Sequence, residues 1–332
     1  MSKRFDVVGI GNAMVDVLAR VEDGFLAEMG VERGIMTLID RSRAVALYAA
    51  MGPAREVSGG SAANTIAGLA ALGARTAYVG KVKDDQLGAI FAHALRAQGA
   101  VYATPPAPPY HAHETGRCLV LVSPDGERSM STYLGVSEFL APSDIDAGQI
   151  AEAAWIFLEG YRFDGPESHA AFEKAIRAAK AAGGRVAITL SDPFCVERHR
   201  DAFARLVRED ADLLVANEFE LMALYRTNDL GAAMERAEAE VPLTACTSGA
   251  QGAHLIGGGR RVHAPSFPFD VVDATGAGDL FAAGLLYGLA AGADRLDATR
   301  MGCLAAAEVI SHLGARPEAD LRALFAREGL AA

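Results

Sequence analysis

The segment Asp273-Ala-Thr-Gly-Ala-Gly-Asp279, which is followed by an apolar run, could place a base beside an anion-binding turn. The pattern predicts a helix that begins at about Gly276, and the first turn of a helix has free N–H groups. Gly276, Ala277 and Gly278 are small enough to let an anion approach those groups. Asp279 lies in the same turn and could accept the proton of an attacking hydroxyl. Alternatively, Asp279 only complements the helix dipole.

Two further polar loops directly follow predicted strands. The loop from Thr247 through Gly249 to Gly252 combines small polar residues with two glycines, which suits a nucleotide phosphate, although hairpin entries have similar sequences. Asn217 and Glu220 are three residues apart and therefore share a helix face. They could hold a hydrated Mg²⁺ that bridges ATP phosphates. The simpler alternative is an N-cap Asn with a capping-box Glu.

The N-terminal part contains two more candidate segments. In Ser58-Gly-Gly-Ser-Ala-Ala-Asn64, Gly59 and Gly60 permit close backbone approach, and Asn64 can both donate to and accept from hydroxyl groups. In Asn12-Ala-Met-Val-Asp16, Asp16 stands where the first strand ends, and its carboxylate is a good partner for vicinal sugar hydroxyls. A surface turn is the alternative for Asp16.

Composition excludes several classes of protein. The chain has 332 residues, of which 51% are hydrophobic, and its net charge is -11 without a basic stripe, which argues against a nucleic-acid partner. Four widely spaced cysteines suggest neither a zinc site nor disulfides. We find no signal peptide and no apolar span of about 20 residues, so we expect a cytoplasmic protein without membrane contact. A P-loop motif is absent, and Gly9-Ile-Gly-Asn-Ala-Met14 lacks the third glycine of a dinucleotide site.

The elements that must position these residues alternate regularly over much of the chain. Apolar strands are predicted at 5–10, 76–79, 155–158, 186–190, 213–216 and 243–247, and helices between them. This pattern predicts an α/β fold with a doubly wound, mostly parallel sheet, which binds ligands beyond the carboxyl ends of its strands. Residues 12–40 and 111–136 do not fit the alternation and are predicted to form a small β-sheet lid. Residues 1–11, 41–110 and 137–332 would form the large nucleotide-binding domain.

Taken together, the glycine-rich segment ending at Asn64 and the C-terminal segment ending at Asp279 make the sequence resemble the ribokinase-like (PfkB) carbohydrate kinases over nearly its whole length. The resemblance implies ATP and Mg²⁺ as cofactors, Asp279 as the base, and an anion hole made by the backbone of Gly276, Ala277 and Gly278. It places ATP and its phosphates at Asn217, Thr247, Gly249, Gly252, Thr275 and Cys303, and a water-bound Mg²⁺ at Asn217 and Glu220. It also implies that Arg128 is the lid arginine that can reach the phosphate, and that Asp273 belongs to a K⁺ site. Ala274 departs from the family's usual Thr in this segment.

Within that family the sequence is most similar to adenosine kinases and their bacterial relatives, in the segments 11–16, 59–64, 190–194 and 310–316. The resemblance implies that Asp16 binds the ribose diol with help from Asn12, Gly59, Gly60 and Asn64. Phe194 and Tyr161 would border the purine ring of the nucleoside. The lid would add Met36, Met130 and Leu134 to the walls of this pocket. These lid residues could instead form only the core of the lid.

The resulting hypothesis is transfer of the γ-phosphoryl group of ATP to the 5′-hydroxyl of adenosine. The first alternative is a kinase for ribose, fructose or a related sugar, which would use the same base. A further alternative is a catalytically silent ATP or nucleoside sensor, but the intact segment around Asp279 argues against it. An oxidoreductase is another alternative, but the missing third glycine argues against it. The chain could be a monomer or a homodimer.

Overall fold

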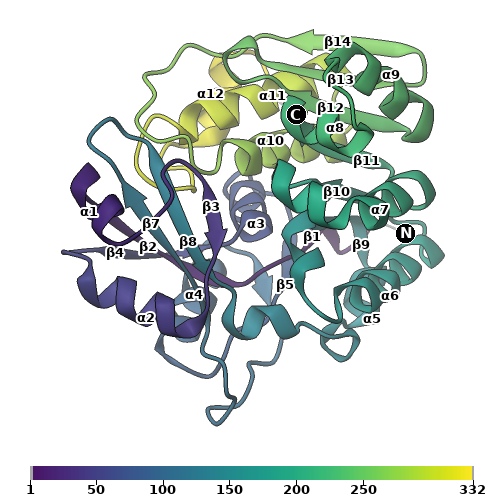
Figure 1. Ribbon diagram of the computed structural model, residues 1–332. Helices are drawn as coiled ribbons and strands as arrows, with labels where there is room; N and C mark the ends of the chain where they lie inside the picture. Colours follow the sequence, from purple (N-terminus) through teal and green to yellow (C-terminus); the bar gives the residue numbers. More distant parts are fainter. Residues whose placement is uncertain (1–2, 331–332) are drawn as a thin grey trace.

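A nine-stranded sheet forms the centre of the computed structural model, which describes residues 3–330 (Figure 1). The strand order is β14-β13-β12-β11-β10-β9-β1-β5-β6, and the strands from β12 to β6 in this order run parallel to one another. The pairs β12–β13 and β13–β14 are antiparallel. The strands are β1 (Phe5–Ile10), β5 (Thr76–Val79), β6 (Val101–Tyr102), β9 (Ala153–Glu159), β10 (Arg185–Thr189), β11 (Leu213–Asn217), β12 (Leu243–Thr247), β13 (Ala253–Gly257) and β14 (Arg260–Ala264).

Helices cover both faces of this sheet because successive strand side chains point to opposite sides. In β1, for example, Val7 belongs to one buried cluster and Val8 to the other. The first cluster includes α3 (Ser61–Ala71), α4 (Gln86–Ala97), α10 (Ala277–Ala291), α11 (Arg295–Val309) and α12 (Leu321–Arg327). The second includes α5 (Ala147–Ala151), α6 (Ser168–Ala181), α7 (Pro193–Glu209), α8 (Glu218–Tyr225) and α9 (Leu230–Glu240). The predicted doubly wound sheet is therefore confirmed.

A second, five-stranded sheet, here called the lid sheet, has the order β3-β8-β7-β2-β4. Its strands are β2 (Met14–Arg20), β3 (Met36–Leu38), β4 (Arg55–Gly59), β7 (Gly116–Val122) and β8 (Arg128–Tyr133). Helices α1 (Asp23–Glu28) and α2 (Arg41–Ala50) cover one face, where Leu26 and Leu47 pack on Leu119 and Leu121. The other face carries Met14, Cys118, Val120 and Met130.

Several details differ from the sequence predictions. The ranges proposed for the lid omit β4, which pairs with β2 although residues 41–110 were assigned to the large domain. Between β11 and β12 the chain forms two helices, α8 and α9, and the small and charged residues of α9 offer few large apolar side chains. Residues 1, 2, 331 and 332, also assigned to the large domain, lie outside the described residues.

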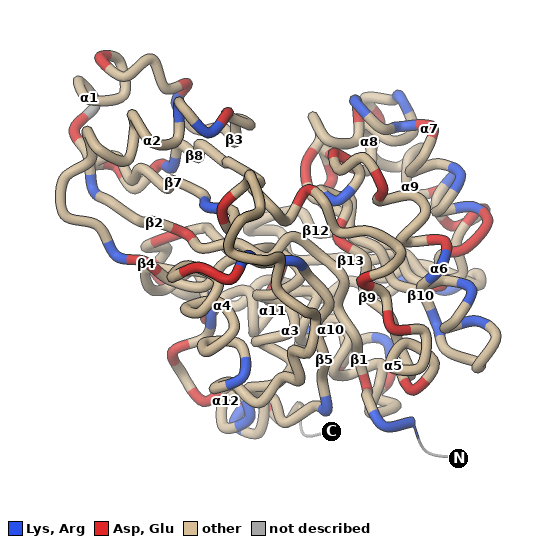
Figure 2. Tube along the Cα trace, turned by 90° about the horizontal axis from the view of Figure 1, so that it is seen from below, with Lys and Arg blue, Asp and Glu red and all other residues tan. Residues whose placement is uncertain are grey.

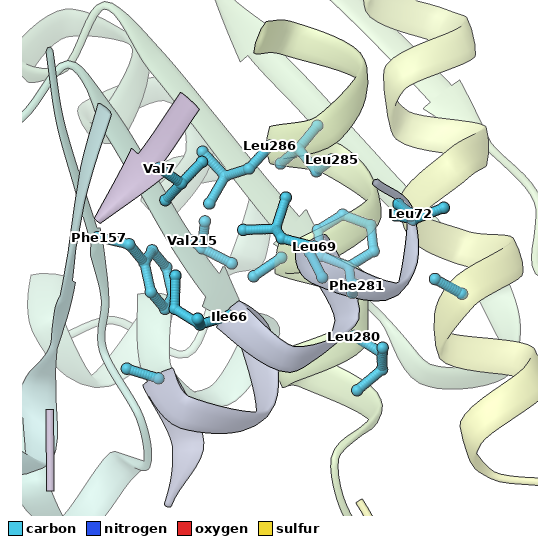
Figure 3. Close-up of a cluster of buried hydrophobic side chains, with 14 of the residues drawn as sticks. Val7, Ile66, Leu69, Leu72, Phe157, Val215, Leu280, Phe281, Leu285 and Leu286 are labelled. Atoms are coloured by element: carbon cyan, nitrogen blue, oxygen red, sulfur yellow. The ribbon is translucent and has the colours of Figure 1, made fainter. Parts of the chain in front are cut away.

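The apolar core between α3 and α10 fixes the relative position of these two helices. Figure 3 shows Leu69 of α3 beside Phe281 and Leu285 of α10, and all three are buried. Gly68 allows the close approach, since a Cβ there would lie 2.6 Å from a side-chain carbon of Leu280. Polar residues near the N-terminal ends of the two helices are thereby brought together.

The described residues contain no helix with the length and apolar character needed to cross a bilayer. Lys and Arg are interspersed with Asp and Glu along the described chain (Figure 2). Positively and negatively charged residues are thus mixed along the chain, and neither kind is confined to one element.

Candidate active site

A cavity of about 540 Å³, here called the central cavity, lies between the lid sheet and the carboxyl ends of the large sheet. It gathers predicted site residues from many separate segments. They are Asn12, Asp16, Met36, Gly60, Asn64, Arg128, Met130, Leu134, Tyr161, Asn217, Glu220, Thr275, Gly276, Ala277, Gly278 and Asp279. Residues that are far apart in the sequence therefore come together at one place in the fold.

Asp279 is held at the first turn of α10 by two side chains of α3. The Ser61 hydroxyl donates to Oδ1 at 2.6 Å, and the Asn64 amide donates to Oδ2 at 3.0 Å. Burial raises the pKa of Asp279, and these two hydrogen bonds act against that rise. Each carboxylate oxygen has a further lone pair, so Asp279 can still accept a proton from a hydroxyl in the cavity.

Asp16 is a buried carboxylate near the end of the cavity formed by β2. Burial raises its pKa to about 7, and the positive charges of Arg316 and Arg128 oppose the rise. Gly59 does not line the cavity but lies behind Asp16, where a Cβ would be 2.3 Å from the carboxyl group. Asn12 is held by Arg162, whose Nη1 donates to Asn12 Oδ1 at 3.0 Å.

The structure adds polar residues that the sequence predictions missed. Glu159 ends strand β9, lines the central cavity and accepts from the backbone N–H of Ala62 at 2.9 Å. Burial raises its pKa to about 7. A polar residue at the carboxyl end of an apolar strand was a signal that could have revealed Glu159. Ser61, the other missed contact of Asp279, follows the two glycines directly.

One side of the central cavity is apolar. The inner face of the lid sheet contributes Met14, Met36, Val120, Met130 and Leu134. A wall of this kind suits a flat ring rather than a cluster of hydroxyl groups.

The two predicted aromatic residues have different positions. Tyr161 lines the cavity, with its hydroxyl 3.3 Å from the Ser191 carbonyl oxygen. Phe194 lines neither this cavity nor the next one and is 55% exposed. The reason is that Asp192 caps α7, so that Cys195 and Val196 face inward and Phe194 faces outward. The structure therefore does not bring Phe194 to the purine-binding position that was expected for it.

A second cavity, of about 490 Å³, lies on the other side of the α10 N-terminus. It contains Thr247, Gly249, Gly252 and Cys303, the predicted ATP-loop residues, together with apolar side chains from Phe267, Phe269, Phe281 and Ile310. Both cavities are lined by Ala274, Ala277 and Gly278. Groups bound in the two cavities would therefore meet at the positive end of α10.

Asn217 and Glu220 form the capping box of α8. Asn217 Oδ1 accepts from the Glu220 N–H at 2.9 Å, and Glu220 Oε2 accepts from the Asn217 N–H at 2.9 Å. Burial raises the pKa of Glu220 to about 7. The described residues hold no group of three or more His, Cys, Asp or Glu suited to a metal. One carboxylate and one amide beside the cavity fit Mg²⁺ that keeps most of its waters, rather than a dedicated cage.

Asp273, the predicted K⁺ ligand, already has three partners. Its Oδ1 accepts from the Thr275 N–H at 2.8 Å and its Oδ2 from the Gly314 N–H at 2.8 Å. The buried guanidinium of Arg128 forms an ion pair with the same carboxylate. Arg128 thus contacts Asp273 in this arrangement, and its positive charge would compete with a monovalent cation for that carboxylate.

Comparisons with known proteins agree with this geometry. A family model described as pfkB family carbohydrate kinase matches residues 37–321. The chain is similar to the structure of a probable sugar kinase from Rhizobium etli CFN 42, with 44% sequence identity, a TM-score of 0.95 and 99% of each chain covered. Adenosine kinase from Sinorhizobium meliloti is 45% identical, with a TM-score of 0.93, and the match covers 98% of this chain and 99% of that one. Among curated relatives, 5-dehydro-2-deoxygluconokinase of Shouchella clausii is 28% identical over 319 residues, which cover 93% of this chain and 90% of the relative.

The family match spans most of the chain, and the similar structures reproduce both sheets. The resemblance seen in the sequence is therefore confirmed at the level of family and fold. The chain belongs to the pfkB family of carbohydrate kinases and is a phosphotransferase that acts on an alcohol group of a small sugar or nucleoside.

Proposed function

We propose that the chain transfers the γ-phosphoryl group of ATP to the 5′-hydroxyl of adenosine, giving AMP and ADP. The observation that carries this proposal is the position of Asp279, at a helix N-terminus shared by two cavities. The central cavity would hold the acceptor and the second cavity the phosphoryl donor. The acceptor hydroxyl and the γ-phosphate would then meet beside the carboxylate that takes the proton.

The residues of the site divide the chemical work. Ser61 and Asn64 orient the Asp279 carboxylate, which accepts the hydroxyl proton as the new O–P bond forms. The N–H groups at the start of α10 stabilise the negative charge on the transferring group. Mg²⁺, held through water at Asn217 and Glu220, would neutralise charge on the ATP phosphates. The lid sheet covers the acceptor and excludes water, a competing acceptor.

Adenosine fits the mixed character of the central cavity. Asp16, Asn12 and Glu159 provide polar groups for ribose hydroxyls. The apolar residues of the lid face provide a wall for the purine. The similarity to the Sinorhizobium meliloti adenosine kinase supports the same acceptor.

A sugar kinase is the second candidate, because the polar residues of the cavity alone would hold a sugar. The similarity to the probable sugar kinase of Rhizobium etli favours it. A bare sugar, however, would leave the methionine-rich wall of the lid without a partner.

The proposal predicts that 5′-deoxyadenosine binds but is not phosphorylated, since it keeps the purine and the diol and lacks only the acceptor hydroxyl. It should inhibit adenosine phosphorylation competitively, with an inhibition constant close to the adenosine KM. ADP release in a coupled assay measures both quantities. Absence of inhibition would contradict the assignment of the central cavity to a nucleoside.

The activity is expected to depend on pH through Asp16. Burial raises the pKa of Asp16 to about 7. The ionised form accepts hydrogen bonds from two hydroxyls, so kcat/KM for adenosine should rise as pH increases and level off above about 7. The measurement is a profile of initial rates at saturating Mg·ATP. A profile that is flat from acidic to neutral pH would refute this role of Asp16.

Turnover is expected not to require K⁺, because Arg128 already balances the Asp273 charge. Replacing K⁺ by tetramethylammonium at equal ionic strength should change the rate less than about twofold, once screening is matched. In an Arg128→Ala variant, K⁺ should restore part of the lost rate, since Asp273 then lacks its cation. Strong K⁺ activation of the unmodified enzyme would contradict this reading of the ion pair.

A further inference from the structure

Arg316 lies in the segment that follows α11 and connects three separate elements. Its Nη1 donates to Gln98 Oε1 at 2.8 Å, at the C-terminal end of α4. Its Nη2 donates to Ser58 Oγ of β4 at 2.8 Å. Its Nε donates to Asn64 Oδ1 of α3 at 3.4 Å. The guanidinium is therefore fixed from several directions.

The side chain of Asn64 lies between Arg316 and Asp279. A guanidinium can only donate hydrogen bonds, whereas an ionised carboxylate can only accept them. Only one orientation of the Asn64 amide satisfies both neighbours, with its oxygen toward Arg316 and its NH₂ toward Asp279. We propose that Arg316 is a positioning residue of the reaction, which holds the Asn64 amide in the orientation that donates to the base Asp279.

Arg316 acts from behind the site rather than on the substrate. It does not line the central cavity. It lines a separate cavity of about 450 Å³, together with Ser58 and Gln98. Burial lowers the pKa of Arg316 to about 10, and the nearby Asp16 opposes that fall, so the guanidinium stays charged at neutral pH.

The surroundings of Asp279 make the orientation of Asn64 consequential. The charge of Asp279 raises the pKa of three other carboxylates, namely Asp16 of β2, Glu159 of β9 and Glu220 of α8, and by reciprocity a negative charge on any of them would disfavour the ionised form of Asp279. The side-chain hydrogen bonds that favour its ionised form come from Ser61 and Asn64. If the Asn64 amide turned over, its oxygen would face the carboxylate and raise the pKa of the base.

The test uses the full-length enzyme with the acceptor that supports turnover, and it rests on the proposed role of Asp279. In Arg316→Met, kcat should fall roughly tenfold, as expected for one lost hydrogen bond to a charged group. The acid limb of the kcat profile should move up by roughly one pH unit. Because Arg316 also lowers the pKa of Asp16, KM is compared well above pH 7, where Asp16 is ionised, and there it should change less than about threefold, since Arg316 does not contact substrate. Arg316→Lys should show smaller changes, because an ammonium keeps the charge without the planar fork.

Arg300→Met is the matched control, because Arg300 contacts only Asp297 on α11 among the interactions that the structure describes. This control should leave kcat and the pH profile unchanged. A thermal melt of each variant separates loss of fold from loss of positioning. A folded Arg316→Met enzyme with an unmoved acid limb would overturn the proposal.

A double-mutant cycle with Asn64 provides the second measurement, which tolerates some destabilisation. If Arg316 acts through Asn64, Arg316→Met should cost less than about twofold in an Asn64→Ala background. A full additional tenfold loss would show independent action and overturn the proposal. If Asp279→Asn keeps full activity, the proposed base itself fails. If Asp279→Asn is inactive while Arg316→Met keeps the original kcat and pH profile, only the present inference fails.

Discussion

Replacing Asp279 by Asn should lower kcat by roughly a thousandfold, within the range attributed to a general base. The amide has nearly the shape of the carboxylate and can keep both contacts, accepting from Asn64 and donating to the Ser61 hydroxyl. It cannot accept the proton of the acceptor hydroxyl. Adenosine affinity, measured by calorimetry, should therefore remain within about threefold of the original, because binding does not need proton transfer.

Asp297→Asn is the control for this substitution. Asp297 also lies in the first turn of a helix, α11, but its side chain contacts Arg300 on the surface. Like Asp279, it can interact favourably with the dipole of its helix, but it lines neither of the two cavities. Equal losses in both variants would point to a dipole effect on folding, and unchanged turnover in Asp279→Asn would refute the base assignment.

Gly278→Ala should lower kcat/KM roughly a hundredfold, the loss expected when contact between a developing oxyanion and its donors is disturbed. Gly278 lines both cavities, and a Cβ built there meets no atom within 4 Å. The methyl group would therefore project into the open space between the two cavities, where the phosphoryl group must pass. The fold should keep its stability, since alanine favours a helix by about 0.5–1 kcal/mol over glycine. Steady-state kinetics and a thermal melt measure the two effects.

Gly276→Ala should behave in the opposite way. Gly276 has a φ of 79°, and a Cβ there would lie 2.7 Å from the Ala315 backbone. The substitution should therefore destabilise the fold, by about 1–2 kcal/mol from the left-handed backbone alone. Gly24→Ala in α1, with open space and no cavity, is the control for both. If Gly278→Ala retained full activity, the phosphoryl group would not lie at this turn.

The sequence was informative wherever function depends on local chemistry. The turn from Asp273 to Asp279 and the loop beginning at Thr247 each follow a recognisable strand or begin a helix, and parallel strands bring such ends together. Their convergence could therefore be predicted without a structure. The alternation of apolar residues likewise predicted the large sheet.

Features that depend on distant packing could not be predicted in this way. Arg316 contacts a residue 252 positions earlier, and no local pattern indicates that contact. The outward direction of Phe194 depends on where α7 begins, one residue before it. The short strand β4 joins the lid sheet through its pairing with β2, which a five-residue segment does not reveal.

The most direct test of the central claim measures ADP release with adenosine, ribose and fructose in parallel, at saturating Mg·ATP, with mass spectrometry of the phosphorylated product. The account predicts rapid turnover of adenosine to AMP and little or none of the sugars. Turnover of ribose or fructose without turnover of adenosine would contradict it, and would mean that the apolar wall of the lid is not a purine site.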